Sequence, residues 1–151
     1  CGATVGSSCS ASGGSGGASV LFKRQVHYNV GALYQSGRGL DQSFESAYEW
    51  FLLGSELGDP YSMLSLGGLY RDGSGIKKDL VEALAWYQVS SLMLDPQDQD
   101  SLRFAEREAR SLVSQLTDAQ RLEATGRLDA LKKFTAPQEP QKSLDEGESS
   151  I

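Results

Sequence analysis

The chain has 151 residues, of which 39% are hydrophobic and 23% charged, and its 14 basic and 20 acidic side chains give a net charge of −6. This length and composition are typical of one globular domain and exclude a chain that is mostly embedded in a bilayer or wholly disordered. The acidic balance argues against a nucleic acid partner, because phosphate binding needs clustered positive charge. One histidine and two cysteines cannot supply a zinc site of the usual type, so we expect no metal and no cofactor.

The composition divides the chain into three zones. Residues 1–19 hold six glycines, six serines and no charged side chain, which predicts a flexible tether. Residues 135–151 hold two prolines and four acids against one lysine, which predicts a disordered acidic tail. The folded domain is therefore expected over residues 20–134.

An internal repeat dominates the predicted domain. Ten residues recur 36 positions later in the chain, and the rare types tryptophan, tyrosine and proline stay in register. The pairs are Gly31/Gly67, Leu33/Leu69, Tyr34/Tyr70, Gly37/Gly73, Gly39/Gly75, Ala47/Ala83, Trp50/Trp86, Ser55/Ser91, Asp59/Asp95 and Pro60/Pro96.

Each copy of the repeat predicts a helical hairpin. In the first copy, a glycine at Gly37 would end the first helix, and the second helix would begin near Ser43. In the second copy, Asp79 is the expected N-cap. We expect Gly31 and Gly67 to face close-packed alanines, and the recurring tryptophans to lie in the core. The apolar residues at helical spacing on the first helix are Val26, Val30, Leu33 and Tyr34.

A third helix pair is predicted over residues 97–134 and would close the stack. The sequence Thr117-x-x-Gln120 is a capping box, which predicts that one helix ends and another begins there. The apolar stripe of the earlier helix comprises Leu102, Ala105, Ala109, Leu112 and Leu116. The later helix is expected to face inward with Leu122, Leu128 and Leu131.

The repeated pattern resembles the Sel-one-like repeat (SLR) family, a relative of the tetratricopeptide repeat. The matching strings are Val30-Gly31-x-Leu33-Tyr34-x-x-Gly37-x-Gly39-Leu40 with Ala47-x-x-Trp50-Phe51, and Leu66-Gly67-x-Leu69-Tyr70-x-x-Gly73-x-Gly75-Ile76 with Ala83-x-x-Trp86-Tyr87. The resemblance implies an all-α fold, a short right-handed α-solenoid of antiparallel helix pairs. Its parts would be repeats at about 26–60 and 61–96, then the capping helix pair at 97–134.

The resemblance also implies where a partner would bind. In tetratricopeptide-like hairpins the first helix of each pair lines the concave side, so we expect a protein or peptide in a concave groove of a monomeric chain. We expect Tyr28 and Arg71 to be surface anchors whose replacement leaves stability nearly unchanged. The residues expected there are Gln25, Tyr28, Ala32, Gln35, Tyr61, Leu64, Gly68 and Arg71.

The start of the chain, Cys1-Gly2, resembles a mature bacterial lipoprotein, which implies lipid attachment at Cys1. Gly2 stands where an aspartate would retain such a protein at the inner membrane, so the resemblance implies the periplasmic face of the outer membrane. The other interpretation is a fragment that happens to begin at Cys1. Together with the repeats, the start of the chain predicts a lipid-anchored periplasmic adaptor or scaffold.

Two other functions are alternatives to a binding adaptor. Some cysteine-rich SLR proteins are linked to penicillin binding and β-lactam hydrolysis, so one alternative function is that of an enzyme acting on cell-wall peptides. The predicted core has no cysteine, and the string Ser74-Gly75-Ile76-Lys77 falls in an expected turn. We therefore expect no enzyme and no catalytic residue, and a passive structural spacer remains the other alternative.

Overall fold

The computed structural model describes residues 16–135, which form six helices and no strand. The predicted tether and tail lie outside this range, except that the first helix begins at Gly16, inside the predicted tether, and the last helix ends at Thr135, the first residue of the predicted tail. The helices are α2 (Gly16–Ser36), α3 (Phe44–Glu56), α4 (Pro60–Asp72), α5 (Leu80–Met93), α6 (Gln99–Gln115) and α7 (Asp118–Thr135).

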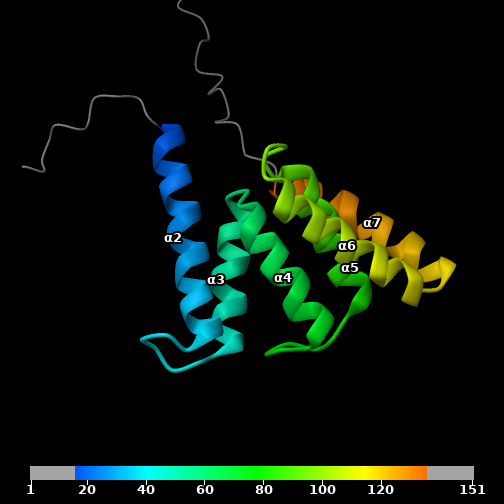
Figure 1. The fold of residues 1–151 in the computed structure, drawn as a ribbon, viewed down its shortest axis with the longest axis horizontal. Coiled ribbons are helices and arrows are strands. Elements are labelled where there is room, and N and C mark those ends of the chain that lie inside the picture. Colours follow the sequence, from blue (N-terminus) through cyan, green and yellow to red (C-terminus); the bar gives the residue numbers. More distant parts are fainter. Residues whose placement is uncertain (1–15, 136–151) are drawn as a thin grey trace, which may run out of the picture.

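The helices stack as successive hairpins (Figure 1). Helix α2 packs along α3, and α4 packs along α5, as the repeat predicts. The third pair continues the stack because α6 and α7 both pack on α5. Helix α5 therefore lies at the centre of the C-terminal half of the described chain, in contact with α4, α6 and α7.

Local capping chemistry sets the ends of these helices. Ser43 and Asp79, at equivalent places in the two repeats, accept hydrogen bonds from the first-turn amides of α3 and α5. Asp59 caps α4, and Pro60 fills the first helical position, where no amide hydrogen is needed. Gly73 ends α4 with a φ of 71°, a left-handed conformation that glycine adopts without steric cost.

The mid-helix glycines face aromatic rings rather than the alanines predicted to contact them. A Cβ on Gly31 would lie 2.6 Å from Cε1 of Phe51, and one on Gly67 would lie 3.0 Å from the ring of Tyr87. Ala47 is fully buried, but the atoms nearest to a Cβ on Gly31 belong to Phe51. The aromatic residue after each repeated tryptophan thus occupies the space that the glycine leaves open.

The two repeated tryptophans occupy different environments, so the prediction that both lie in the core is wrong for one of them. Trp86 is 3% exposed and belongs to a core cluster that includes Leu131 of α7. Trp50 is only half-buried, with its ring centroid 5.5 Å from that of His27. Helix α7, which supplies Leu131, packs mainly on α5, the helix that carries Trp86.

The predicted capping box between α6 and α7 is confirmed. The amide of Gln120 donates to Thr117 Oγ1 at 3.3 Å, and the amide of Thr117 donates to Gln120 Oε1 at 3.0 Å. The prediction that Leu122 faces inward is wrong, because this side chain is 74% exposed. Ala124 is buried instead. Residues two positions apart on a helix point in directions about 200° apart around its axis, so Leu122 and Ala124 lie on nearly opposite faces.

Two apolar positions assigned to the buried face of the first helix are also exposed. Val26 is 38% exposed and Leu33 is 41% exposed. Helix α2 stands at the N-terminal end of the described stack and contacts mainly α3 (Figure 1). Its buried stripe is consequently narrower than that of α4, whose Leu69, equivalent to Leu33, is 1% exposed.

Candidate functional site

A groove of about 530 Å³ runs along the first helices of the pairs, α2, α4 and α6. Five of the six residues predicted to bind a partner line it, together with Gly68. These five residues come from both repeats, and the first and last of them are 43 positions apart in the sequence. They are Tyr28, Gln35, Tyr61, Leu64 and Arg71.

The sixth predicted residue, Gln25, lies elsewhere. It lines a neighbouring hollow of about 570 Å³ between α2, the start of α4 and the end of α5. Tyr61 belongs to both hollows and marks the boundary between them. Ala32 is half-buried and lines neither.

The groove also contains residues that the sequence did not indicate. Ser101 and Phe104 come from α6, whose place as the first helix of a third pair could have indicated them. Phe44 comes from the start of α3, and Tyr87 comes from α5. No sequence signal identifies Tyr87, because second helices are not expected on the concave side.

Aromatic side chains give the groove much of its lining and join it to the core. The ring centroid of Tyr28 lies 5.9 Å from that of Tyr61 and 6.0 Å from that of the buried Phe51. The rings of Tyr87 and Phe104 meet edge-on at 6.2 Å. Such aromatic pairs stabilise the groove beyond the area that they bury, so its wall is held in place by core contacts.

Tyr61 ties α4 to the start of α6. Its hydroxyl donates to Asp98 Oδ2 at 2.8 Å, and Asp98 is the N-cap of α6. Hydrogen bonds from Ser101 and Tyr61 hold the pKa of Asp98 below its ordinary value. The same contact raises the pKa of Tyr61, because ionisation would remove the donated proton.

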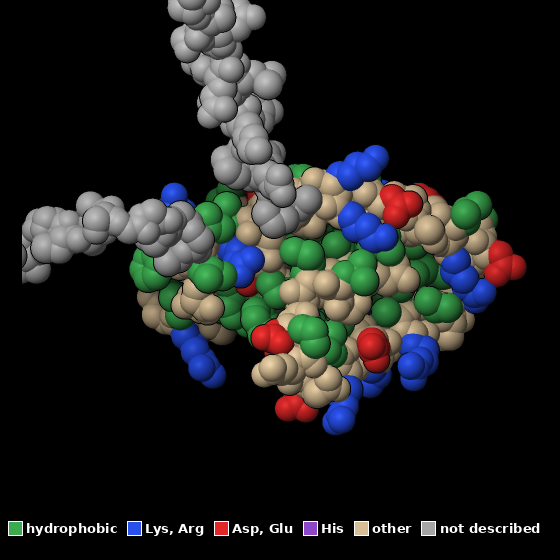
Figure 2. Space-filling model, turned by 90° about the horizontal axis from the view of Figure 1, so that it is seen from above, with side chains coloured by type: hydrophobic (Ala, Val, Ile, Leu, Met, Phe, Trp, Pro, Cys, Tyr) green, Lys and Arg blue, Asp and Glu red, His purple; other side chains and the backbone are tan. Residues whose placement is uncertain are grey.

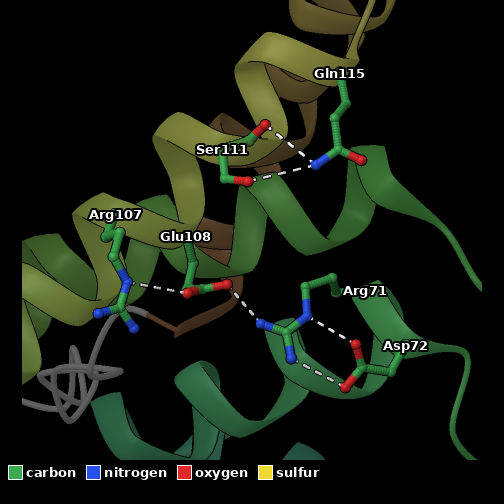
Figure 3. A network of polar contacts seen from close by, with 6 residues as sticks. All are labelled: Arg71, Asp72, Arg107, Glu108, Ser111 and Gln115. Carbon is green, nitrogen blue, oxygen red and sulfur yellow. Dashed lines mark hydrogen bonds and ion pairs between the residues drawn. The ribbon is translucent and has the colours of Figure 1, made fainter.

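Arg71 is not a free anchor, because its guanidinium is held by two carboxylates (Figure 3). Its Nε and Nη2 contact the two oxygens of Asp72 at 2.8 and 3.0 Å, and its Nη1 contacts Glu108 Oε2 at 2.5 Å. Glu108 also pairs with Arg107 at 3.3 Å. Beside Arg71 the pKa of Asp72 is lowered. The two guanidinium groups and the two carboxylates therefore balance one another in charge.

The molecular surface shows no dominance of one charge on the face seen from above (Figure 2). Hydrophobic side chains gather over its middle, and both basic and acidic side chains lie along its margin (Figure 2). In residues 16–135 no group of three or more His, Cys, Asp or Glu side chains could hold a metal ion. None of the described helices has the length and apolar character to cross a membrane.

Comparison with known proteins assigns the repeat. Residues 25–59 and 60–92 each match the Sel1 repeat. The second segment coincides with the hairpin α4–α5, and the first begins nine residues inside α2 and includes all of α3. Sel1 repeat folds generally mediate contacts between proteins and are generally non-catalytic scaffolds.

One solved structure supports the same fold. The chain is similar to the crystal structure of c5321, described as a protective antigen present in uropathogenic Escherichia coli strains displaying an SLR fold, with a TM-score of 0.67 and 22% identity. The match covers 83% of this chain but only 27% of that one. A Sel1 repeat protein from Oxalobacter formigenes matches with a TM-score of 0.48 and 21% identity, over 74% of this chain and 51% of that one. No curated protein matches the sequence. The predicted all-α solenoid of helical hairpins is confirmed.

Proposed function

We propose that this chain is an adaptor or scaffold that binds another protein in the groove of its Sel1 repeats. The observation that carries the proposal is the convergence of five predicted residues from two repeats on one groove. Solenoids of stacked hairpins present extended concave surfaces of this kind to their partners. Tyrosine, which is a favoured residue at interface anchors, contributes three side chains here: Tyr28, Tyr61 and Tyr87.

The stiffness of the groove supports a binding role. Tyr28 rests on Phe51, Tyr61 is bonded to Asp98, and Arg71 is bonded to Asp72 and Glu108. Side chains that are already ordered lose little conformational entropy when a partner arrives. A partner would therefore meet a preformed surface.

Lipid attachment at Cys1 is a second part of the proposal. Cys1 lies outside the described residues, so this part rests on the resemblance of Cys1-Gly2 to a mature lipoprotein. Acylation of Cys1 would anchor the adaptor at the periplasmic face of the outer membrane. Each buried methylene group would contribute about 0.8 kcal/mol to that anchoring.

Site-specific photocrosslinking tests the binding role. A photoreactive amino acid replaces Leu64, in the groove, and in a matched control it replaces Leu122, which is 74% exposed on α7. We expect a discrete crosslinked protein from the Leu64 position and none from the Leu122 position in cells that produce the chain. A product from Leu122 alone would place the interface elsewhere. No product from either position would favour a passive spacer and contradict the proposal.

A further inference from the structure

Gly68 on α4 is a glycine that the helix itself does not need. Gly68 lies inside α4 and is not one of the glycines with a positive φ, so its backbone has the ordinary helical conformation. In a helix interior, glycine is destabilising relative to alanine. A Cβ on Gly68 would meet only the hydroxyl of Tyr87, at an ordinary contact distance of 3.6 Å. The adjacent Gly67 differs, because its Cβ would press on the Tyr87 ring at 3.0 Å. The equivalent residue of the first repeat is Ala32, so this place in the repeat accepts a methyl group.

The side chain of Tyr87 reaches the groove from α5, on the core side of α4. Its side chain starts on α5, passes under Gly67 and brings the hydroxyl to Gly68, while the residue as a whole is only 1% exposed. Within residues 16–135 the side chain of Tyr87 makes no hydrogen bond. Its hydroxyl is not one of the fully enclosed polar atoms that lack a partner, so it is open to the groove that Tyr87 lines. Burial raises the pKa of Tyr87 to about 12, so the hydroxyl remains a proton donor at neutral pH.

The surroundings favour a neutral acceptor for this proton. Arg71, Asp72, Arg107 and Glu108 satisfy one another's charge, and a charged ligand group would have to break these pairs. A peptide carbonyl is neutral and a strong acceptor. In an α-helix the carbonyls are already bonded within the helix, whereas an extended segment offers them to its surroundings. The missing Cβ at Gly68 is what allows a backbone to approach the hydroxyl closely.

We propose that the occupant of the groove is an extended segment of the partner protein, with its backbone over Gly68 and one carbonyl oxygen accepting a hydrogen bond from the Tyr87 hydroxyl. Apolar side chains of the segment would contact Leu64 and Phe104, which line the groove on α4 and α6. This inference rests on the proposed function and adds the chemistry of the occupant to it.

The test uses the full chain and a peptide probe. Random twelve-residue peptides displayed on phage are selected on the chain, and the tightest is synthesised with a fluorescent label for anisotropy titrations. We expect Gly68→Ala and Tyr87→Phe each to weaken binding about five- to tenfold, the range of one net hydrogen bond. Gly126→Ala on α7 is the matched control, since nothing lies within 4 Å of its Cβ, and it should bind like the native chain.

Two further measurements separate binding from folding. Thermal unfolding should show Gly68→Ala to be at least as stable as the native chain, because alanine favours the helix and its Cβ has room. Replacing each peptide carbonyl oxygen by sulfur, a weaker acceptor, should identify one position that weakens binding to the native chain. The same peptide should lose nothing further on Tyr87→Phe, since the donor is already gone.

The outcomes distinguish this inference from the proposed function. Leu64→Arg places a long charged side chain in the groove and should abolish binding of the probe. If Leu64→Arg abolishes binding but Gly68→Ala and Tyr87→Phe do not change it, the inference is overturned and the groove remains the binding site. If Leu64→Arg leaves binding unchanged, the peptide binds outside the groove and the proposed function is contradicted. A selection that yields no peptide overturns the inference alone, because photocrosslinking still tests the groove.

Discussion

Arg71 on α4 and Glu108 on α6 form an ion pair that joins the second Sel1 repeat to the helix that follows it, with Nη1 and Oε2 2.5 Å apart. The two residues are 37 positions apart in the sequence. Arg71 also holds Asp72, so it is both part of the groove and part of the structure that supports it. The expectation that Tyr28 and Arg71 could be replaced without loss of stability is therefore not supported by their contacts, since Tyr28 packs on Phe51.

Removing the ion pair should loosen α6. We expect Arg71→Gln to lower the free energy of unfolding by about 1 kcal/mol, because the Arg71 side chain is 35% exposed and solvent screens the pair. A double-mutant cycle with Glu108→Gln, measured by urea denaturation, should give a coupling of about 0.5–1 kcal/mol. Strict additivity of the two substitutions would contradict a role for this pair in docking α6.

The two repeated tryptophans should differ in their contribution to stability. We expect Trp86→Ala to cost about 3–5 kcal/mol, because it leaves a cavity in the core beside Leu131. Trp50→Ala should cost about 1–2 kcal/mol, because the side chain is only half-buried. Chemical denaturation of both variants measures the difference, and equal losses would contradict the different environments of these residues.

A second matched pair lies in the turns of the two hairpins. Gly39 and Gly75 have φ values of 79° and 73°, so alanine should be strained at both. A Cβ on Gly75 would also lie 2.7 Å from the backbone carbonyl carbon of Phe44, whereas nothing lies within 4 Å at Gly39. We expect Gly39→Ala to lower the melting temperature modestly and Gly75→Ala to cost at least about 1 kcal/mol more, as overpacking does. Calorimetry that ranks them in the opposite order would disprove the contact between the second turn and α3.

Asp59 should make stability depend on pH in a direction opposite to that of Asp98. Burial raises the pKa of Asp59, so the folded state binds its proton more tightly than the unfolded state does. Its contribution to stability is therefore greatest at low pH and declines as pH rises from the ordinary carboxyl value through the raised one. Hydrogen bonds lower the pKa of Asp98, so its contribution is present at neutral pH and is lost as pH falls through the lowered value.

The asparagine variants test this difference. Asp59→Asn keeps an acceptor for the amide of Ser62, so the helix cap remains while the buried charge is removed. Relative to this variant, the native chain should become less stable as pH rises from about 3 to 7. Relative to Asp98→Asn, it should become more stable over the same range. Urea denaturation midpoints of the native chain and both variants, measured across that pH range, give these differences. If the difference from the native chain changes with pH in the same direction for both variants, the pKa directions are refuted.

Membrane attachment through Cys1 predicts a simple fractionation result. We expect Cys1→Ser to move the protein from the membrane fraction to the soluble fraction, because the thiol that would carry the acyl chains is absent. Cys9→Ser is the matched control and should leave the protein with the membranes. Continued membrane retention of Cys1→Ser would remove the lipid anchor from the proposed function.

The parts of this fold that could be read from the sequence depend on neighbours within a few positions of the chain. The capping box at Thr117 and Gln120 and the Asp59-Pro60 start of α4 are contacts between residues at most three positions apart. The 36-residue repeat adds helix pairing, because the same hairpin recurs. For the same reason, five of the six residues predicted from their place in the hairpin to bind a partner do line the groove.

The sequence alone predicted the hairpin unit and its turns, and it placed the expected binding residues on one face of the hairpin. Only the tertiary structure decided which of two identical residues is buried, as with Trp50 and Trp86, and which glycine is crowded, as with Gly39 and Gly75. It also decided that Tyr87 reaches the groove past Gly67 and that Arg71 is paired with Glu108. The physical reason is that burial and pairing depend on the helix stacked next in space, and equivalent residues of a repeat do not have equivalent neighbours at the ends of a short stack.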